Sequence, residues 1–71
     1  MNRYLNIGGN SNVIGYEIGY YFIDIMFPGK TYRYSYLSAG VNNVETMKEL
    51  ARAGYGLNSF IMKNCRYSYE K

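Results

Sequence analysis

The sequence predicts one small α+β domain, in which a three-stranded antiparallel sheet is followed by two helices packed on one of its faces. Three observations support this prediction. The chain has 71 residues, which is enough for a single core. Its first half contains short aromatic and β-branched runs separated by glycine-rich turns. Its second half changes to the period of amphipathic helices.

The first half of the chain is expected to form the sheet. Residues 1–10 end in a glycine-rich, turn-forming cluster and are expected to be a flexible lead-in to a single domain over residues 11–67. Residues 13–18 form the first expected strand. Residues 20–27 form the second, whose aromatic and β-branched run is the strongest strand pattern in the chain.

The two faces of the expected second strand differ in polarity, because successive side chains point to opposite faces. The face without a charge is expected to line the core and consists of Tyr21, Ile23, Ile25 and Phe27. The other face carries Asp24 and leaves three apolar side chains without cover in this chain: Tyr20, Phe22 and Met26. A soluble monomer seldom leaves such a patch bare, so the patch is expected to be a subunit interface or a binding surface.

A proline-glycine turn is expected to close a hairpin after this strand. Pro28 sets φ and Gly29 supplies the left-handed position. The third strand is expected over residues 31–36, where alternation places three tyrosines on one face: Tyr32, Tyr34 and Tyr36.

Helices are expected in the second half. Apolar residues recur at helical spacing over residues 41–51. Asn42, followed three places later by Glu45, predicts an N-cap with a capping-box partner, and Gly54 predicts the end of the helix. A second helix is expected over residues 57–64.

The C-terminal residues 65–71 are polar and aromatic, and they fit either a short edge strand or disorder. The domain is expected to end at residue 67, which leaves residues 68–71 as a tail. No apolar run approaches the roughly 20 residues needed to span a bilayer, and the first residues do not resemble a secretory signal. A cytoplasmic protein is therefore expected, in a bacterium or in a bacterial host cell if a phage encodes it.

The composition argues against catalysis. Cys65 is the single cysteine and the chain has no histidine, so a disulfide within the chain, a zinc site and a histidine-activated nucleophile all lack their residues. The five carboxylates are scattered, with no spacing that pairs two of them. We therefore expect a protein that is not an enzyme, with no catalytic residue, metal or cofactor.

Several short motifs follow one another at set distances: Ser11-Asn12-Val13, Gly15-Tyr16-Glu17, Ile23-x-Ile25-x-Phe27, Gly29, Tyr32-x-Tyr34, Gly54, Leu57-Asn58 and Ile61. This order resembles the KTSC domain, a module found as a C-terminal extension of some lysyl-tRNA synthetases and as a stand-alone protein. The resemblance covers residues 11–67 and implies the fold of that family. Its attachment to a synthetase implies RNA binding.

The family's central Tyr-x-Tyr pair corresponds to Tyr32 and Tyr34, and its late asparagine corresponds to Asn58. The chain departs from the family at Gly56, where a bulky residue is favoured. It also has three further tyrosines: Tyr36, Tyr67 and Tyr69. These departures fit a divergent member.

The residues expected to bind a ligand combine aromatic and basic side chains: Lys30, Tyr32, Arg33, Tyr34, Tyr36, Arg52, Asn58 and Arg66. Tyrosines can stack on bases, and the cations can meet phosphates. The simpler interpretation is that the tyrosines fill the edge of the core, the cations are solvated surface, and Asn58 caps the second helix. Arg33 is expected to point away from Tyr32 and Tyr34, so one strand face cannot supply both stacking and charge.

Two functions are the main hypotheses, and a domain that only stabilises or docks onto a larger partner also remains open. The first is binding of single-stranded RNA or a nucleotide-type ligand, which fits the aromatic strand and the net charge of +3. The second is a homo-oligomer that uses the Tyr20, Phe22 and Met26 face as its interface. In that case the protein is expected to be a phage-encoded anti-defence protein that sequesters a cyclic nucleotide immune signal, or that blocks a bacterial defence effector by protein-protein contact.

Overall fold

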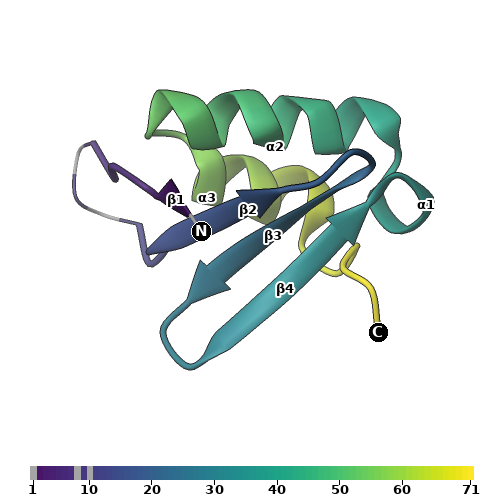
Figure 1. Cartoon of the computed structure of the whole chain (residues 1–71), viewed down its shortest axis with the longest axis horizontal. Coiled ribbons are helices and arrows are strands. Elements are labelled where there is room, and N and C mark those ends of the chain that lie inside the picture. The colour runs from purple at the N-terminus through teal and green to yellow at the C-terminus, as the bar shows by residue number, and fades with distance from the viewer. Residues whose placement is uncertain (1, 8, 10) are drawn as a thin grey trace.

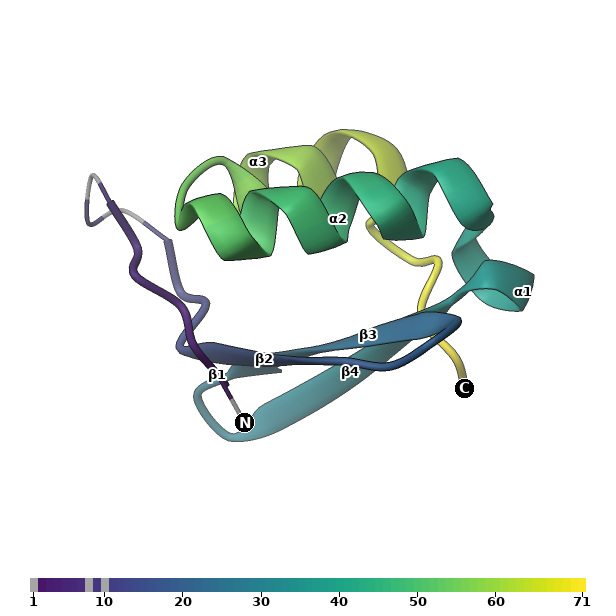
Figure 2. The same ribbon diagram turned by 45° about the horizontal axis from the view of Figure 1, so that its top comes forward.

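The computed structural model describes residues 2–7, 9 and 11–71, which form a sheet with helices above one of its faces (Figures 1 and 2). The elements in chain order are β1 (Asn2–Arg3), β2 (Gly15–Ile18), β3 (Phe22–Phe27), β4 (Lys30–Ser35), α1 (Tyr36–Ala39), α2 (Val41–Ala53), α3 (Leu57–Phe60) and the π-helical turn η1 (Ile61–Cys65). The strands are antiparallel and lie in the order β1-β2-β3-β4. The predicted fold class, an antiparallel sheet followed by helices on one face, is confirmed.

The sheet has one strand more than the sequence pattern predicts. Asn2 and Arg3 pair with β2, and Tyr4 beside them is only 3% exposed. The Tyr4 hydroxyl accepts a hydrogen bond from the Leu57 backbone N–H at 3.3 Å. The expectation of a flexible lead-in is therefore corrected for these residues, because burial of the Tyr4 ring ties the start of the chain to the core. In the expected glycine-rich turn, Gly8 and Asn10 lie outside the described residues.

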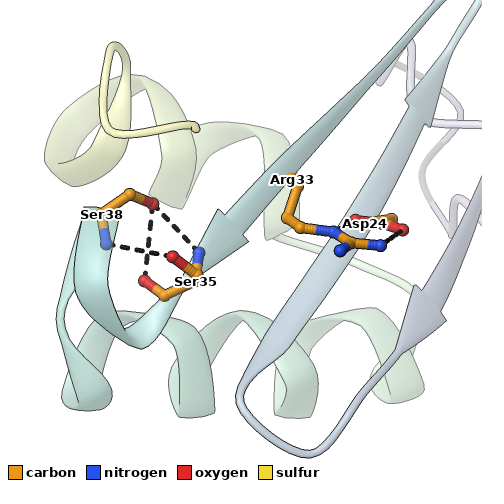
Figure 3. A network of polar contacts seen from close by, with 4 residues as sticks. All are labelled: Asp24, Arg33, Ser35 and Ser38. Atoms are coloured by element: carbon orange, nitrogen blue, oxygen red, sulfur yellow. Dashed lines mark hydrogen bonds and ion pairs between the residues drawn. The ribbon is translucent and has the colours of Figure 1, made fainter. Parts of the chain in front are cut away.

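The strand bounds differ from the predicted ones where turns intervene. β3 begins at Phe22, because the Gly19 N–H donates to the Phe22 carbonyl across a turn at 2.9 Å. Tyr21 lies in this turn and is 57% exposed, so its predicted place in the core is wrong. β4 ends at Ser35, where a capping box starts α1: the Ser38 N–H donates to Ser35 Oγ and the Ser35 N–H donates to Ser38 Oγ (Figure 3).

The helices cover the apolar face of β3, as its alternation predicts. Ile23 and Ile25 are fully buried, and they pair with Tyr34 and Tyr32 of β4. Both tyrosines therefore lie on the face that α2 and α3 cover (Figure 2). The helices and η1 contribute six buried apolar side chains to this core: Val44, Met47, Ala51, Leu57, Ile61 and Cys65.

The sequence predicts the C-terminal end of α2 correctly but not its N-terminal end. The helix begins after Gly40, so the prediction of Asn42 as its N-cap is wrong. Gly54 ends it as predicted, with φ of 84° and its N–H bonded to the Leu50 carbonyl. A Cβ at Gly54 would lie 2.7 Å from Cβ of Leu5, so this position also needs glycine for space.

The predicted second helix is present as α3 followed by η1, and it extends to Cys65. After it, the tail returns to the sheet, where the Glu70 N–H donates to the Arg33 carbonyl at 2.7 Å. The tail thus covers part of the β4 edge without forming a strand. Among the described residues, no helix has the length and apolar character to cross a membrane.

Candidate functional site

A cleft of about 320 Å³ lies between the β3–β4 hairpin and the segment around and after η1. Nine residues line it: Phe27, Pro28, Lys30, Tyr32, Tyr34, Met62, Arg66, Tyr67 and Tyr69. Five of these side chains are aromatic and two are cationic. The cleft therefore joins large π surfaces to positive charge.

The aromatic wall is built on β4 and on the returning tail. The Tyr32 and Tyr69 ring centroids are 4.6 Å apart, and Tyr69 meets Tyr34 edge-on at 6.3 Å. Phe27 meets Tyr32 in the same edge-on manner at 5.8 Å. These separations are those of favourable aromatic pairs, so the rings hold one another in place.

Tyr34 forms the floor of this wall rather than its surface. Its side chain is almost wholly buried, with 2% of the residue exposed. Burial raises the pKa of Tyr34 to about 12, with smaller contributions from Cys65 and from the Tyr32 and Tyr69 hydroxyls. The half-buried Tyr32 and the exposed Tyr67 present more of their rings to a ligand.

The two cations of the cleft are exposed and lie above aromatic rings. Lys30 Nζ is 5.9 Å from the Tyr32 ring centroid, and Arg66 Cζ is 5.9 Å from that of Tyr67. Both distances are within the range of cation–π contacts. Neither cation forms an ion pair with a carboxylate in the part of the chain that the structure describes, so both charges are available to an anion.

Arg33 lies between Tyr32 and Tyr34 in the chain but on the opposite face of the sheet (Figure 3). It makes a bidentate ion pair with Asp24, with Nε to Oδ1 at 2.7 Å and Nη2 to Oδ2 at 3.0 Å. Its guanidinium also lies 3.8 Å from the ring centroid of Phe22. The hydrogen bond to Asp24 raises the pKa of Arg33. Arg33 is therefore engaged within the chain and does not line the cleft.

Tyr36 joins α1 to α2 instead of lining the cleft. Its hydroxyl donates a hydrogen bond to Glu45 Oε2. The same oxygen forms an ion pair with Lys48 Nζ at 2.9 Å. The bond from Tyr36 is the main cause that lowers the pKa of Glu45, and the same bond raises the pKa of Tyr36. Lys48 is buried and also donates to the Tyr20 carbonyl at 3.1 Å. This cluster fixes the β2–β3 turn to the helices.

Two other predicted ligand residues also lie outside the cleft lining. Arg52 is exposed in the last turn of α2. Asn58 is half-buried in α3, whose N-cap is Gly56, so the prediction that Asn58 caps this helix is wrong. The cleft thus unites four members of the predicted ligand set: Lys30, Tyr32, Tyr34 and Arg66.

The predicted ligand set omits the rings that complete the cleft. Tyr67 and Tyr69 come from the tail, and Phe27 comes from the end of β3. The only sequence signal for the tail residues is their excess of tyrosine, which by itself does not say that the tail returns to β4.

The three residues expected to form a subunit interface do not share one strand face. Tyr20 lies in the turn before β3 and is 89% exposed. Phe22 is covered on one side by Arg33, and its ring lies so close to Gly19 that a Cβ there would overlap it. Met26 is half-buried and pairs with Gly15 and Thr31. The chain's own side chains therefore cover part of the expected patch.

The protein is a small α+β domain with an aromatic cleft, whose two cations have no carboxylate partner among the described residues. No family model, curated protein or solved structure matches the chain. The resemblance to the KTSC domain stays a prediction.

Proposed function

We propose that the protein binds a nucleotide-type ligand or single-stranded RNA in this cleft and performs no catalysis. The observation that carries the proposal is the meeting of aromatic rings with two exposed cations in one cleft. A nucleotide combines a flat π-faced base with a charged phosphate, and the cleft offers a partner to each. Its volume of about 320 Å³ is within the range of small-molecule sites.

The energies of these contacts favour a base as the main recognised group. Stacking of a base on an aromatic side chain contributes about 1–3 kcal/mol. An exposed charge contact contributes less, about 0–1 kcal/mol, because water and salt screen it. The rings of the cleft should therefore dominate affinity, while Lys30 and Arg66 should favour ligands that carry phosphate.

The proposal is tested by replacing one ring of the cleft and one ring outside it. Tyr32→Leu keeps the apolar character of the site and removes the aromatic face. We expect it to weaken binding of nucleoside monophosphates and of short single-stranded RNA about 5- to 150-fold, as measured by titration calorimetry. Circular dichroism would show whether the variant keeps its fold.

Tyr55→Leu is the matched control, since Tyr55 is exposed between two glycines and does not line the cleft. Its affinity for the same ligands should equal that of the unmodified protein. Equal losses in both variants, or an unchanged affinity in Tyr32→Leu, would show that the cleft is not the binding site.

A further inference from the structure

We infer that the cleft accepts a single nucleotide unit, one base with its adjacent phosphate, and does not follow an RNA chain over successive bases. This inference rests on the proposed function and specifies the ligand of the same site. It follows from how the tail covers β4 and from how the cations are distributed.

The tail removes the platform on which two successive bases would stack. Tyr32 and Tyr34 lie on the same face of β4, but Tyr69 packs against both rings. Tyr34 is buried beneath this contact. The hydrogen bond from the Glu70 N–H to the Arg33 carbonyl holds the tail in this place. The half-buried Tyr32 keeps part of its ring open to one base, whereas the buried Tyr34 has no free face for a second base.

The charges outside the cleft do not continue along β4. A protein that follows a single strand needs cations at successive phosphates. Arg33 is the only other cation of β4, and it points to the opposite face, where Asp24 neutralises it. Lys48 is buried in its pair with Glu45. Among the described residues, the cleft itself holds only Lys30 and Arg66, which suit one phosphate group.

The size of the cleft agrees with this ligand. A volume of about 320 Å³ is at the lower end of the range for small-molecule sites. Its rings come from both sides, with Tyr32 on the hairpin and Tyr67 on the C-terminal segment. A cleft of this size suits one nucleotide unit better than an extended chain.

The experiment compares three kinds of ligand by titration calorimetry: the common nucleosides, their 5′-monophosphates and short homopolymeric RNAs of the same bases. We expect the monophosphates to bind more tightly than the nucleosides. After correction for the number of equivalent positions, RNA affinity should be within about threefold of monophosphate affinity. The logarithm of RNA affinity should fall with the logarithm of salt concentration with a slope of about −0.7, the value for one neutralised phosphate on a single strand.

Two variants connect these results to the residues. Lys30→Gln should reduce the preference for monophosphate over nucleoside. Arg52→Gln, an exposed cation outside the cleft, should leave that preference unchanged. RNA that binds at one equivalent per molecule, and only with a terminal phosphate, would assign the site to a strand end. Equal binding at internal positions would assign it to any single nucleotide.

RNA that binds more than tenfold tighter per position than the monophosphate, with a slope of about −3 or steeper, would overturn the single-unit inference and leave the proposed function intact. Absence of binding by all three ligand classes would overturn both. An affinity that Tyr32→Leu leaves unchanged would place the site elsewhere and would also overturn both.

Discussion

The two faces of β4 show how alternate residues of one strand acquire different roles. Tyr32 and Tyr34 face the helices and the tail, where they form part of an aromatic cleft. Arg33 faces the open side, where it pairs with Asp24 and covers Phe22. In the unfolded chain, nothing distinguishes the two cations that β4 will contain, Lys30 and Arg33. In the folded chain Asp24 neutralises Arg33, whereas Lys30 has no carboxylate partner among the described residues. The number of basic residues therefore does not measure the charge that a ligand meets.

The largest effect on stability is expected at Tyr34, where the cleft face of β4 reaches the core. Tyr34→Ala leaves a large cavity beneath Tyr69 and beside Ile23. We expect the free energy of unfolding to fall by about 3–5 kcal/mol, as for other buried aromatic residues that are replaced by alanine. Urea denaturation measures this change. Tyr34→Phe keeps the ring and should remain close to the unmodified protein at neutral pH. An alanine variant with an unchanged urea midpoint would contradict the packing described.

The next-largest effect is expected at Tyr69, whose ring packs against Tyr32 and Tyr34. Tyr69→Ala removes two aromatic pairs, each worth about 0.5–1.5 kcal/mol, so urea denaturation should show a loss of about 1–3 kcal/mol. The same change uncovers Tyr34. The affinity for short RNA should therefore rise relative to that for monophosphates. A ratio that stays constant would mean that Tyr69 does not limit the number of bases bound.

Alkaline pH should test the burial of Tyr34 without altering its packing. Its pKa is raised to about 12 in the fold, against about 10 in an unfolded chain. The folded state holds this proton more tightly, so its contribution is complete below pH 10 and is lost as pH rises to about 12. We expect the unmodified protein to lose about 1–2 kcal/mol more than Tyr34→Phe over this interval. Parallel stability curves for the two proteins would contradict this.

The smallest effect is expected on the open face. Arg33→Gln breaks the pair with Asp24, which is exposed and should contribute little to stability. Ligand affinity should not change, because Arg33 does not line the cleft. Lys30→Gln, on the same strand, should lower the affinity for phosphate-bearing ligands about two- to fivefold. A larger loss from Arg33→Gln than from Lys30→Gln in calorimetry would reverse the assignment of the two faces.

Local patterns predict the central elements well. The alternation of Ile23 and Ile25 identifies the core face of β3, and the Pro28-Gly29 pair identifies its hairpin with β4. Apolar spacing and Gly54 identify the body and end of α2. These predictions succeed because strand alternation, turns and helix periodicity depend on residues near one another in the chain.

Predictions fail where distant segments decide the outcome or where the local signal is weak. β1 has two residues, too few to show any alternation, and it exists because β2 pairs with it. The tyrosine alternation of β4 continues to Tyr36, but the reciprocal Ser35–Ser38 bonds start α1 there. A serine three places after another is a weak helix signal, since the usual capping box has glutamate or glutamine at the second position.

The residue pattern alone is enough to establish an α+β chain with Tyr32 and Tyr34 on one face of a strand and Arg33 on the other. Tertiary structure decides which of those groups a ligand can reach. Tyr69 lies far from Tyr32 in the chain and becomes its neighbour only when the tail returns to β4. Burial and ion pairing depend on such long-range contacts, and no local period encodes them. The cleft and the position of its two cations are therefore properties of the folded chain.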